Sequence, residues 1–297
     1  MMKKTILITM LLCLGIMIMM AGCSSEPQQP AGDQITFSNL TETSVQEEVA
    51  DLMTGAGISD ARQDVFFDHV NQFNQTVEPD DLTKGYETAG IMDVKYDPYA
   101  MQDAWMNRYP DFLGYNCRIT AYSLFGDFIA IPLGEEVRDD MILMDLSALE
   151  EDASAMEVVD GDLERFKILY STIPTEATKD VTVHAAKVKA DWHDRGIRFP
   201  EKEKVSLITV WFHDQLETDE LFIGHVGVLF DTADGLCFVE KLAFQEPYQV
   251  VNFKNRAELQ HYMMTKYDFS EGQPTAPPFV MENDQLMEGY REKPANE

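Results

Sequence analysis

The sequence has few cysteines, few histidines and few basic residues. Its 297 residues include four cysteines and six histidines, and it contains neither His-Glu-x-x-His nor paired Cys-x-x-Cys motifs. A zinc site of the usual kinds has little sequence support, and we expect no cofactor. The 23 Lys and Arg residues are outnumbered by 52 Asp and Glu residues, which gives a net charge of −29. This charge repels phosphate, so it argues against a nucleic-acid partner and against a domain lying flat on anionic lipid.

One long hydrophobic run occurs, and it lies at the N-terminus. Lys3 and Lys4 precede an apolar stretch over 5–20, the tetrapeptide Met20-Ala21-Gly22-Cys23 closes it, and a polar Ser-, Gln- and Pro-containing segment follows. The run is short for a membrane-spanning helix, and its layout is typical of a targeting signal. The tetrapeptide resembles the lipobox of bacterial lipoproteins.

This resemblance implies a signal peptide over 1–22, a lipidated Cys23 as the new N-terminus, and a flexible linker over 23–33. Acyl chains such as palmitate would then hold the mature chain at the extracytoplasmic face of the cell membrane. Removal of 1–22 takes away two lysines and leaves the chain more acidic still. The alternative is an ordinary secretory signal that is cleaved without lipidation.

Two cysteines, Cys117 and Cys237, remain in the part of the chain expected to fold, because Cys13 leaves with the signal peptide. Cys117 lies in Gly-Tyr-Asn-Cys-Arg-Ile-Thr-Ala-Tyr-Ser-Leu-Phe-Gly-Asp, a mostly apolar stretch that predicts a buried helix beginning near the cysteine, with Asn116 as N-cap. The positive end of the helix dipole favours thiolate, so this position is typical of a nucleophile. A structural disulfide between the two cysteines is the main alternative.

Helical patterns come first along the chain and strand patterns later, which predicts an α+β fold. We expect one domain over 34–268, a loop over 76–96, a mostly solvated acidic connection over 134–161, and a polar tail over 269–297. A capping box of Ser44 with Glu47 predicts a helix start. His69 is expected as a core or subsurface histidine. The expected helices are 44–53, 60–73, one opening at 97–98 and ended by Pro110, the cysteine helix, 163–170, 181–194 and one from Asn255 to about 267; the expected strands are 34–37, 205–212, 221–230 and 236–244.

The last two strands carry a histidine and a carboxylate. If residues 231–234 form the hairpin loop, His225 lies directly opposite Glu240 and the two side chains are in contact. A loop longer by one residue would instead bring Val239 or Lys241 across. Because Cys237 and Glu240 are an odd number of positions apart, they point to opposite faces, which makes the disulfide awkward. Cys237 is then expected as a small buried hydrophobic residue.

His225 and Glu240 each have an alternative role. His225 is alternatively a core histidine, although the flanking Gly224 and Gly227 indicate that something approaches the strand closely. Glu240 on an apolar strand needs a partner, and Arg118 is the rival to His225. As oxyanion donors the sequence offers the Cys117 N–H and a side chain from Tyr115, Asn107 or Gln102.

A cysteine at a helix start, followed on later strands by His225-Val226-Gly227-Val228 and Phe238-Val239-Glu240, resembles the papain-like superfamily, in particular its cell-wall peptidases and amidases. The chain departs from the family pattern in having Asn-Cys-Arg around Cys117 instead of Asp-Cys-Ser-Gly, and a glutamate at 240 where histidine, asparagine or aspartate is commoner. The resemblance implies a papain-like fold and a thiol hydrolase of amide bonds, with Cys117 as nucleophile, His225 as general base and acid, and Glu240 as the orienting acid. Peptidoglycan peptides are the substrate class it implies. The mature chain also resembles an uncharacterised family of bacterial lipoproteins with a domain of unknown function. A non-catalytic binding or surface lipoprotein with a papain-like core is the alternative function.

Overall fold

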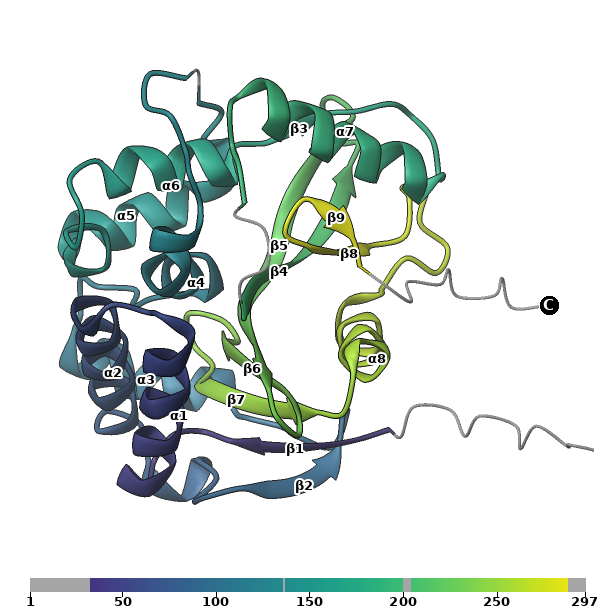
Figure 1. Cartoon of the computed structure of the whole chain (residues 1–297). Coiled ribbons are helices and arrows are strands. Elements are labelled where there is room, and N and C mark those ends of the chain that lie inside the picture. The colour runs from purple at the N-terminus through teal and green to yellow at the C-terminus, as the bar shows by residue number, and fades with distance from the viewer. Residues whose placement is uncertain (1–32, 136, 200–203, 288–297) are drawn as a thin grey trace, which may run out of the picture. The chain divides into compact units, whose positions relative to one another are not determined.

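The structure, a computed structural model, describes residues 33–135, 137–199 and 204–287 (Figure 1). The expected signal peptide, the lipidated Cys23 and the linker up to residue 32 lie outside the described residues. The described residues belong to one compact unit. Within them, no helix is both long enough and apolar enough to cross a membrane.

The described residues form an α+β fold around a nine-stranded antiparallel sheet. The strand order is β2-β1-β7-β6-β5-β4-β8-β9, and β3 pairs with one end of β5. The strands are β1 (Gln34–Ser38), β2 (Glu87–Gly90), β3 (Ile173–Pro174), β4 (Val205–Asp214), β5 (Glu220–Thr232), β6 (Gly235–Lys241), β7 (Tyr248–Phe253), β8 (Phe279–Glu282) and β9 (Gln285–Leu286).

Helices surround this sheet (Figure 1). The α-helices are α1 (Thr43–Ala56), α2 (Asp60–Asn74), α3 (Pro98–Arg108), α4 (Cys117–Phe125), α5 (Leu143–Glu151), α6 (Asp162–Tyr170), α7 (Val181–Asp194) and α8 (Arg256–Tyr267), and the short 3₁₀ turns are η1 (Pro79–Asp81), η2 (Gly126–Phe128), η3 (Asp140–Ile142) and η4 (Ser154–Met156).

Side chains that alternate along the central strands belong to two hydrophobic clusters, one on each face of the sheet. In β6, Cys237 and Val239 join the cluster that holds α4, whereas Leu236 and Phe238 join the cluster that holds α8. This is the period of two expected for a strand covered on both faces. Glu240 continues the alternation of Leu236 and Phe238, so its carboxylate points to the face of the sheet that α8 covers.

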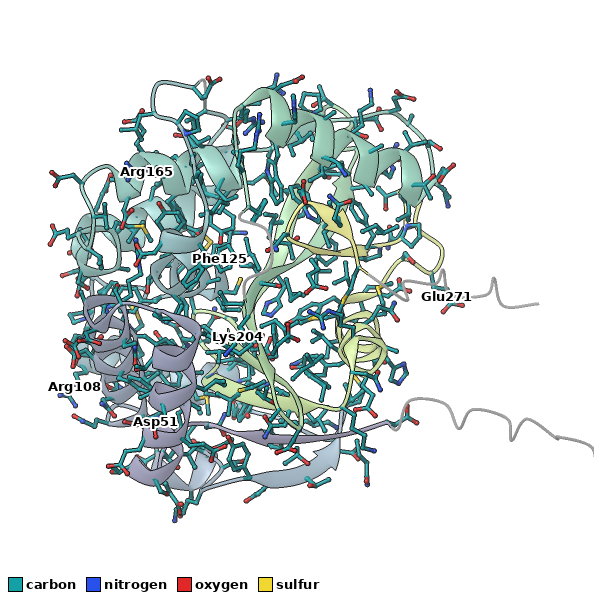
Figure 2. The ribbon with its side chains drawn as sticks, in the orientation of Figure 1. Asp51, Arg108, Phe125, Arg165, Lys204 and Glu271 are labelled. Atoms are coloured by element: carbon teal, nitrogen blue, oxygen red, sulfur yellow. The ribbon has the colours of Figure 1, made fainter. Side chains whose placement is uncertain are left out.

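Strands β5 and β6 stop pairing next to the predicted site residues His225 and Glu240. Their ladder ends at the pair Gly227 and Glu240, while β5 continues toward Glu220 beside β4. Helix α4 packs against both strands, and Figure 1 shows it next to the stretch where they part. Side chains fill the spaces between the ribbons (Figure 2). His225 therefore lies just beyond the last β5–β6 pair.

Helices α3, α4 and α8 begin with side-chain caps, and the cap at Asn116 is as predicted. The Asn116 side chain accepts a hydrogen bond from the Ile119 N–H at 3.0 Å, and Asp97 and Asn255 cap α3 and α8 in the same way. The capping box of Ser44 is wrong, because α1 begins at Thr43 and its N-cap, Glu42, makes no side-chain capping bond.

Four segments differ from the sequence prediction. The loop over 76–96 contains edge strand β2, and the acidic connection over 134–161 contains α5, whose Asp145 is fully buried. The tail over 269–297 is corrected in its first part, since β8 and β9 extend the sheet from β4. Strand β7 is absent from the prediction, although it lies in the middle of the sheet. Strands β2 and β8 are short and pair with β1 and β4, which are far away in sequence, whereas β7 follows directly after its partner β6.

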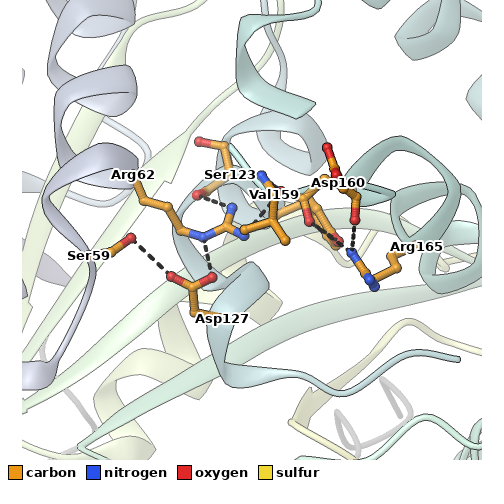
Figure 3. A network of polar contacts seen from close by, with 9 residues as sticks. Ser59, Arg62, Ser123, Asp127, Val159, Asp160 and Arg165 are labelled. Atoms are coloured by element: carbon orange, nitrogen blue, oxygen red, sulfur yellow. Dashed lines mark hydrogen bonds and ion pairs between the residues drawn. The ribbon is translucent and has the colours of Figure 1, made fainter. Parts of the chain in front are cut away.

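A buried arginine connects the three helices α2, α4 and α6 (Figure 3). Arg62 of α2 is 1% exposed and binds Asp127 at 2.8 Å and Asp162 at 3.1 Å, and it donates to the Ser123 carbonyl at 2.9 Å. A buried charge is tolerated only with such partners. The contacts fix the C-terminal end of α4 against the start of α6.

Candidate active site

Cys117 is the first residue of α4 and is 6% exposed. Its own N–H belongs to the first turn, which has no acceptor within the helix. Asn116 directly before it caps the helix, and Gly114 takes a left-handed φ of 87° that lets the chain pass close to Trp105. The local sequence thus places a thiol at the positive end of a helix dipole.

His225 links the thiol to a carboxylate. Its Nε2 lies 2.5 Å from Oε2 of Glu240, and a second hydrogen bond joins the imidazole to Cys117. Since Nε2 is engaged by Glu240, Nδ1 is the nitrogen left for the sulfur. His225 and Glu240 are each 1% exposed. Cysteine, histidine and glutamate therefore form one hydrogen-bonded chain that spans α4, β5 and β6.

The hairpin register differs from the predicted one by two residues. Thr232 pairs with Gly235 across a two-residue loop, so Gly227, and not His225, lies opposite Glu240. The expected direct pair is corrected to a diagonal one. A shift of two keeps every side chain on its face, so the contact between His225 and Glu240 survives.

The two glycines of β5 have the predicted close neighbours. A Cβ on Gly224 would overlap the Phe212 ring, and one on Gly227 would overlap the Phe238 ring and meet the Val239 carbonyl. Bulkier residues on either side of His225 would push these rings away. The glycines thus allow tight packing around the histidine.

Glu240 has two further hydrogen-bond donors. Its Oε1 accepts from Nε2 of Gln249 at 2.7 Å and from the Tyr262 hydroxyl at 2.5 Å. On the other side of the pair, the Tyr267 ring stacks on His225 with centroids 4.5 Å apart. The carboxylate and the imidazole are therefore fixed in position by α8 and β7.

The electrostatics favour an ion pair between cysteine and histidine. Burial raises the pKa of Cys117, but the hydrogen bond from His225 and its charge outweigh this, so the pKa lies below the ordinary value. Burial lowers the pKa of His225, but hydrogen bonds to Cys117 and Glu240 raise it to about 9. For Glu240, burial raises the pKa, and the bond from His225 more than reverses this. Thiolate and imidazolium therefore coexist between the pH at which the thiol loses its proton and the pH at which the imidazolium does.

Arg118 does not pair with Glu240. Its guanidinium binds the carboxylate of Asp145 at 2.6 Å and 2.8 Å and donates to the Ile223 carbonyl at 3.0 Å. Asp145 also accepts from the Asn116 side chain at 2.8 Å. The predicted rival ion pair is therefore wrong, and this network instead anchors the residues on both sides of Cys117.

Cys117 and Cys237 are both free thiols, so the disulfide alternative is not realised. Cys237 is 4% exposed and lies in the hydrophobic cluster, as expected for a small buried apolar side chain. Its burial raises its pKa to about 12. The pKa values of these two buried thiols thus shift in opposite directions.

Of the side chains expected as oxyanion donors, Tyr115 already has other contacts. The Tyr115 hydroxyl lies 3.3 Å from the Ser154 hydroxyl and its ring stacks on His69 at 3.7 Å. His69 is 7% exposed and buried as expected, and burial lowers its pKa to about 4. Gln102 and Asn107 lie on α3, half-buried and exposed respectively.

The described residues contain no group of three or more His, Cys, Asp and Glu side chains that could hold a metal ion. The Cys117, His225 and Glu240 side chains are instead hydrogen-bonded to one another. The chemistry available to this site is that of a thiolate with an adjacent proton donor.

Sequence reasoning missed the residues that hold Glu240. Gln249 lies directly opposite Glu240 in the β6–β7 ladder, so a prediction of β7 would have indicated it. Tyr262 lies on the predicted helix, between Leu259 and Met263 on its buried face. A polar group at a buried helical position was the available signal.

The comparison with protein families gives one result that covers most of the chain. A family described as Domain of unknown function (DUF4300) matches residues 36–287. The chain belongs to this family. The matched range includes α4, β5, β6 and α8, and hence every residue of the candidate site. Neither the search of curated proteins nor the search of solved structures gave a significant match.

Proposed function

We propose that this member of the DUF4300 family is a thiol hydrolase of amide bonds with a papain-like core. The observation that carries the proposal is the hydrogen-bonded chain from Cys117 through His225 to Glu240. A nucleophile, a base and an orienting acid from three separate elements are what acyl transfer by a thiol requires. The start of α4 adds a favourable dipole for the thiolate.

The papain-like assignment rests on the arrangement of these elements. The cysteine begins a helix packed on an antiparallel sheet, the histidine is on a strand of that sheet, and the acid is on the next strand. Helix α8 on the opposite face of β6 supplies Tyr262 to the acid. This layout is the one implied by the sequence resemblance.

In the proposed reaction, the Cys117 thiolate attacks the carbonyl carbon of the scissile amide. His225, as imidazolium, gives its proton to the departing amine, which leaves a thioester on Cys117. The neutral imidazole then takes a proton from water, whose oxygen attacks the thioester and releases the acid. Glu240 keeps the imidazole oriented in both states and stabilises its positive charge when it is protonated.

We further propose that the enzyme acts at the cell envelope as a lipoprotein anchored at Cys23, on the peptides of peptidoglycan. The signal-like N-terminus and the lipobox resemblance support this location, and the resemblance to cell-wall peptidases supports the substrate class. The chain needs no nucleic acid, cofactor or metal in this scheme.

The test uses the full chain purified in detergent with two probes. p-Nitrophenyl acetate reports acyl transfer through a release of nitrophenolate and an acetyl group on Cys117 found by mass spectrometry. Soluble peptidoglycan peptides report amide hydrolysis through new amino groups. We expect both signals in the wild type and neither in Cys117→Ala or His225→Ala. Acetylation that persists in His225→Ala would contradict the proposed chemistry.

The second candidate is a non-catalytic binding lipoprotein with the same core. The observation that favours it is burial, because the Cys117, His225 and Glu240 side chains belong to residues that are 6%, 1% and 1% exposed. A thiol that never meets solvent would not react with p-nitrophenyl acetate in the folded protein. Failure of acetylation in a wild type that is folded by circular dichroism would select this second function.

A further inference from the structure

Tyr170, the last residue of α6, has a buried hydroxyl group without a hydrogen-bond partner. The residue is 2% exposed, and its oxygen contacts no donor or acceptor within bonding distance among the residues described. Burying a hydroxyl without a partner is unfavourable. By contrast, the Tyr122 hydroxyl donates to Asp162 at 3.1 Å and the Tyr262 hydroxyl donates to Glu240 at 2.5 Å. The Tyr170 hydroxyl is therefore available to a group that the structure does not contain.

Helix α6 runs antiparallel to α4 and brings Tyr170 to the cysteine end. Asp162, at the start of α6, binds Tyr122 and Arg62, and Arg62 also binds the Ser123 carbonyl near the end of α4. At a rise of 1.5 Å per residue, the distance along the α6 axis from Asp162 to Tyr170 is about 12 Å. The distance along the α4 axis from Tyr122 back to Cys117 is about 7–8 Å. Tyr170 thus lies level with the start of α4 or beyond it.

Ring packing along the two helices supports this placement. The Phe166 ring meets the Tyr122 ring edge-on at 5.9 Å, and Tyr170 packs on Phe166 at 4.8 Å, one turn further along α6. Three residues after Tyr170 the chain enters β3, where Ile173 pairs with Leu221 on the strand that carries His225. The end of α6 is therefore fixed between α4 and β5.

The charges near Tyr170 agree with this position. Burial raises the pKa of its hydroxyl well above the ordinary value, the Cys117 charge raises it further, and Arg118 opposes this shift. Tyr170 therefore keeps its proton at any pH at which the site works. It is a hydrogen-bond donor within electrostatic reach of the nucleophile.

We propose that the Tyr170 hydroxyl and the backbone N–H of Cys117 form the oxyanion hole of this site. This inference rests on the proposed hydrolase function. When Cys117 Sγ forms a bond to the carbonyl carbon, the π electrons of the C=O bond move to oxygen, and Tyr170 donates a hydrogen bond to that oxyanion without losing its proton. Collapse restores the C=O bond and expels the leaving group, so Tyr170 ends the cycle unchanged.

The test compares two reactions of Cys117 in the full chain, one with an oxyanion and one without. Acetylation by p-nitrophenyl acetate passes through a tetrahedral oxyanion, whereas alkylation by iodoacetamide is a direct displacement at carbon. Removal of one oxyanion donor slows the first reaction by about 10²–10³-fold. We therefore expect Tyr170→Phe to slow acetylation by about 10²-fold and to change the alkylation rate by less than about twofold.

Tyr122→Phe is the matched control, because it removes a buried hydroxyl that lies five residues after Cys117 on α4 and is already bonded to Asp162. We expect it to leave the ratio of acetylation to alkylation unchanged. Since the Tyr170 hydroxyl has no partner to lose, Tyr170→Phe should melt no lower than the wild type.

Two outcomes would overturn the inference. Equal acetylation in Tyr170→Phe and wild type would show that the hydroxyl does not bind the oxyanion. Equal slowing of acetylation and alkylation would show a structural role only. Failure of the proposed function itself is a different result, because the wild type would then show no acetylation of Cys117 at all.

Discussion

The carboxylate of Glu240 accepts hydrogen bonds from His225, Gln249 and Tyr262, at 2.5 Å, 2.7 Å and 2.5 Å. Three donors around one buried charge satisfy most of its lone pairs, which favours the ionised carboxylate in a core. Its charge in turn favours the protonated form of His225. The reactivity of the thiol therefore depends on a residue two steps away in the chain of contacts.

Glu240→Gln tests that dependence. The amide keeps the size of the side chain and removes the charge, so the pKa of His225 should fall from about 9 toward its ordinary value and the pKa of Cys117 should rise. We expect acetylation at pH 7 to slow by at least about tenfold. The measurement is the rate of p-nitrophenyl acetate acetylation against pH.

Tyr262→Phe is the control for this prediction. It removes one donor from Glu240 but keeps the carboxylate, so its effect on the pKa of His225 should be smaller than that of Glu240→Gln. Equal pH profiles for wild type and Glu240→Gln would contradict the role given to the carboxylate.

The sequence predicts the candidate site residues better than it predicts their contacts. Cys117, His225 and Glu240 can be singled out because thiol, imidazole and carboxylate side chains in apolar segments need partners. The partners themselves cannot be predicted in the same way. Arg118 is the nearest basic residue to the thiol in sequence, yet Asp145 of an unpredicted helix binds it.

At the scale of elements, the hairpin of β5 and β6 shows which side-chain positions can be predicted from an assumed strand register. The prediction assumes a loop of four residues between the strands. In the structure the loop has two residues, since Thr232 pairs with Gly235, whose φ is 150°. The predicted register is shifted by two residues, an even number, so the face of the sheet to which each side chain points is still predicted correctly. Face assignments from alternation are therefore more robust than assignments of opposite residues.

Helix α4 is also held by the contact between Gly126 and Arg62, and this contact is testable. A Cβ on Gly126 would lie 2.6 Å from the guanidinium of Arg62, which is 1% exposed and tied to three partners. The arginine has no room to move, so Gly126→Ala should destabilise the fold by about 1–3 kcal/mol. Urea unfolding followed by circular dichroism measures this change.

Gly55→Ala is the matched control in the same experiment. A Cβ at Gly55, within α1, meets no atom within 4 Å. Alanine there should stabilise the helix by about 0.5–1 kcal/mol. Equal effects of the two substitutions would contradict the close packing of Gly126 on Arg62.

At the scale of the whole chain, the C-terminal segment up to residue 287 belongs to the fold. Its Pro, Glu and Gln content is typical of a polar tail, but Phe279, Val280 and Met281 of β8 are fully buried beside β4. A four-residue strand that pairs with a segment some seventy residues earlier leaves almost no periodic signal. Long-range pairing of this kind is what sequence patterns cannot supply.

Truncation tests this assignment. A chain ending at residue 270 lacks β8 and β9 and exposes the edge of β4. Burial of three large apolar side chains contributes about 1.5–3 kcal/mol each, which together is comparable to the stability of a whole domain. We expect this chain to aggregate or melt far below the chain ending at residue 287. Equal melting temperatures by circular dichroism would contradict the role of β8.

The most direct test of the proposed ion pair is the pH dependence of iodoacetamide labelling at Cys117, read by mass spectrometry, with Cys237 as the internal comparison. The two thiols have similar exposure, 6% and 4%, but the pKa of Cys117 is lowered and that of Cys237 is raised to about 12. As pH rises, the thiolate of Cys117 should form below the ordinary thiol pKa of about 8.5, and labelling should stay high above pH ~9, because loss of the His225 proton leaves the thiolate in place.

In His225→Ala, we expect the labelling midpoint of Cys117 to move up toward or above the ordinary thiol pKa, while Cys237 stays unlabelled until strongly alkaline pH. That result would establish the ion pair on which the proposed hydrolase depends. A Cys117 midpoint near that of Cys237, unchanged by the loss of His225, would contradict it.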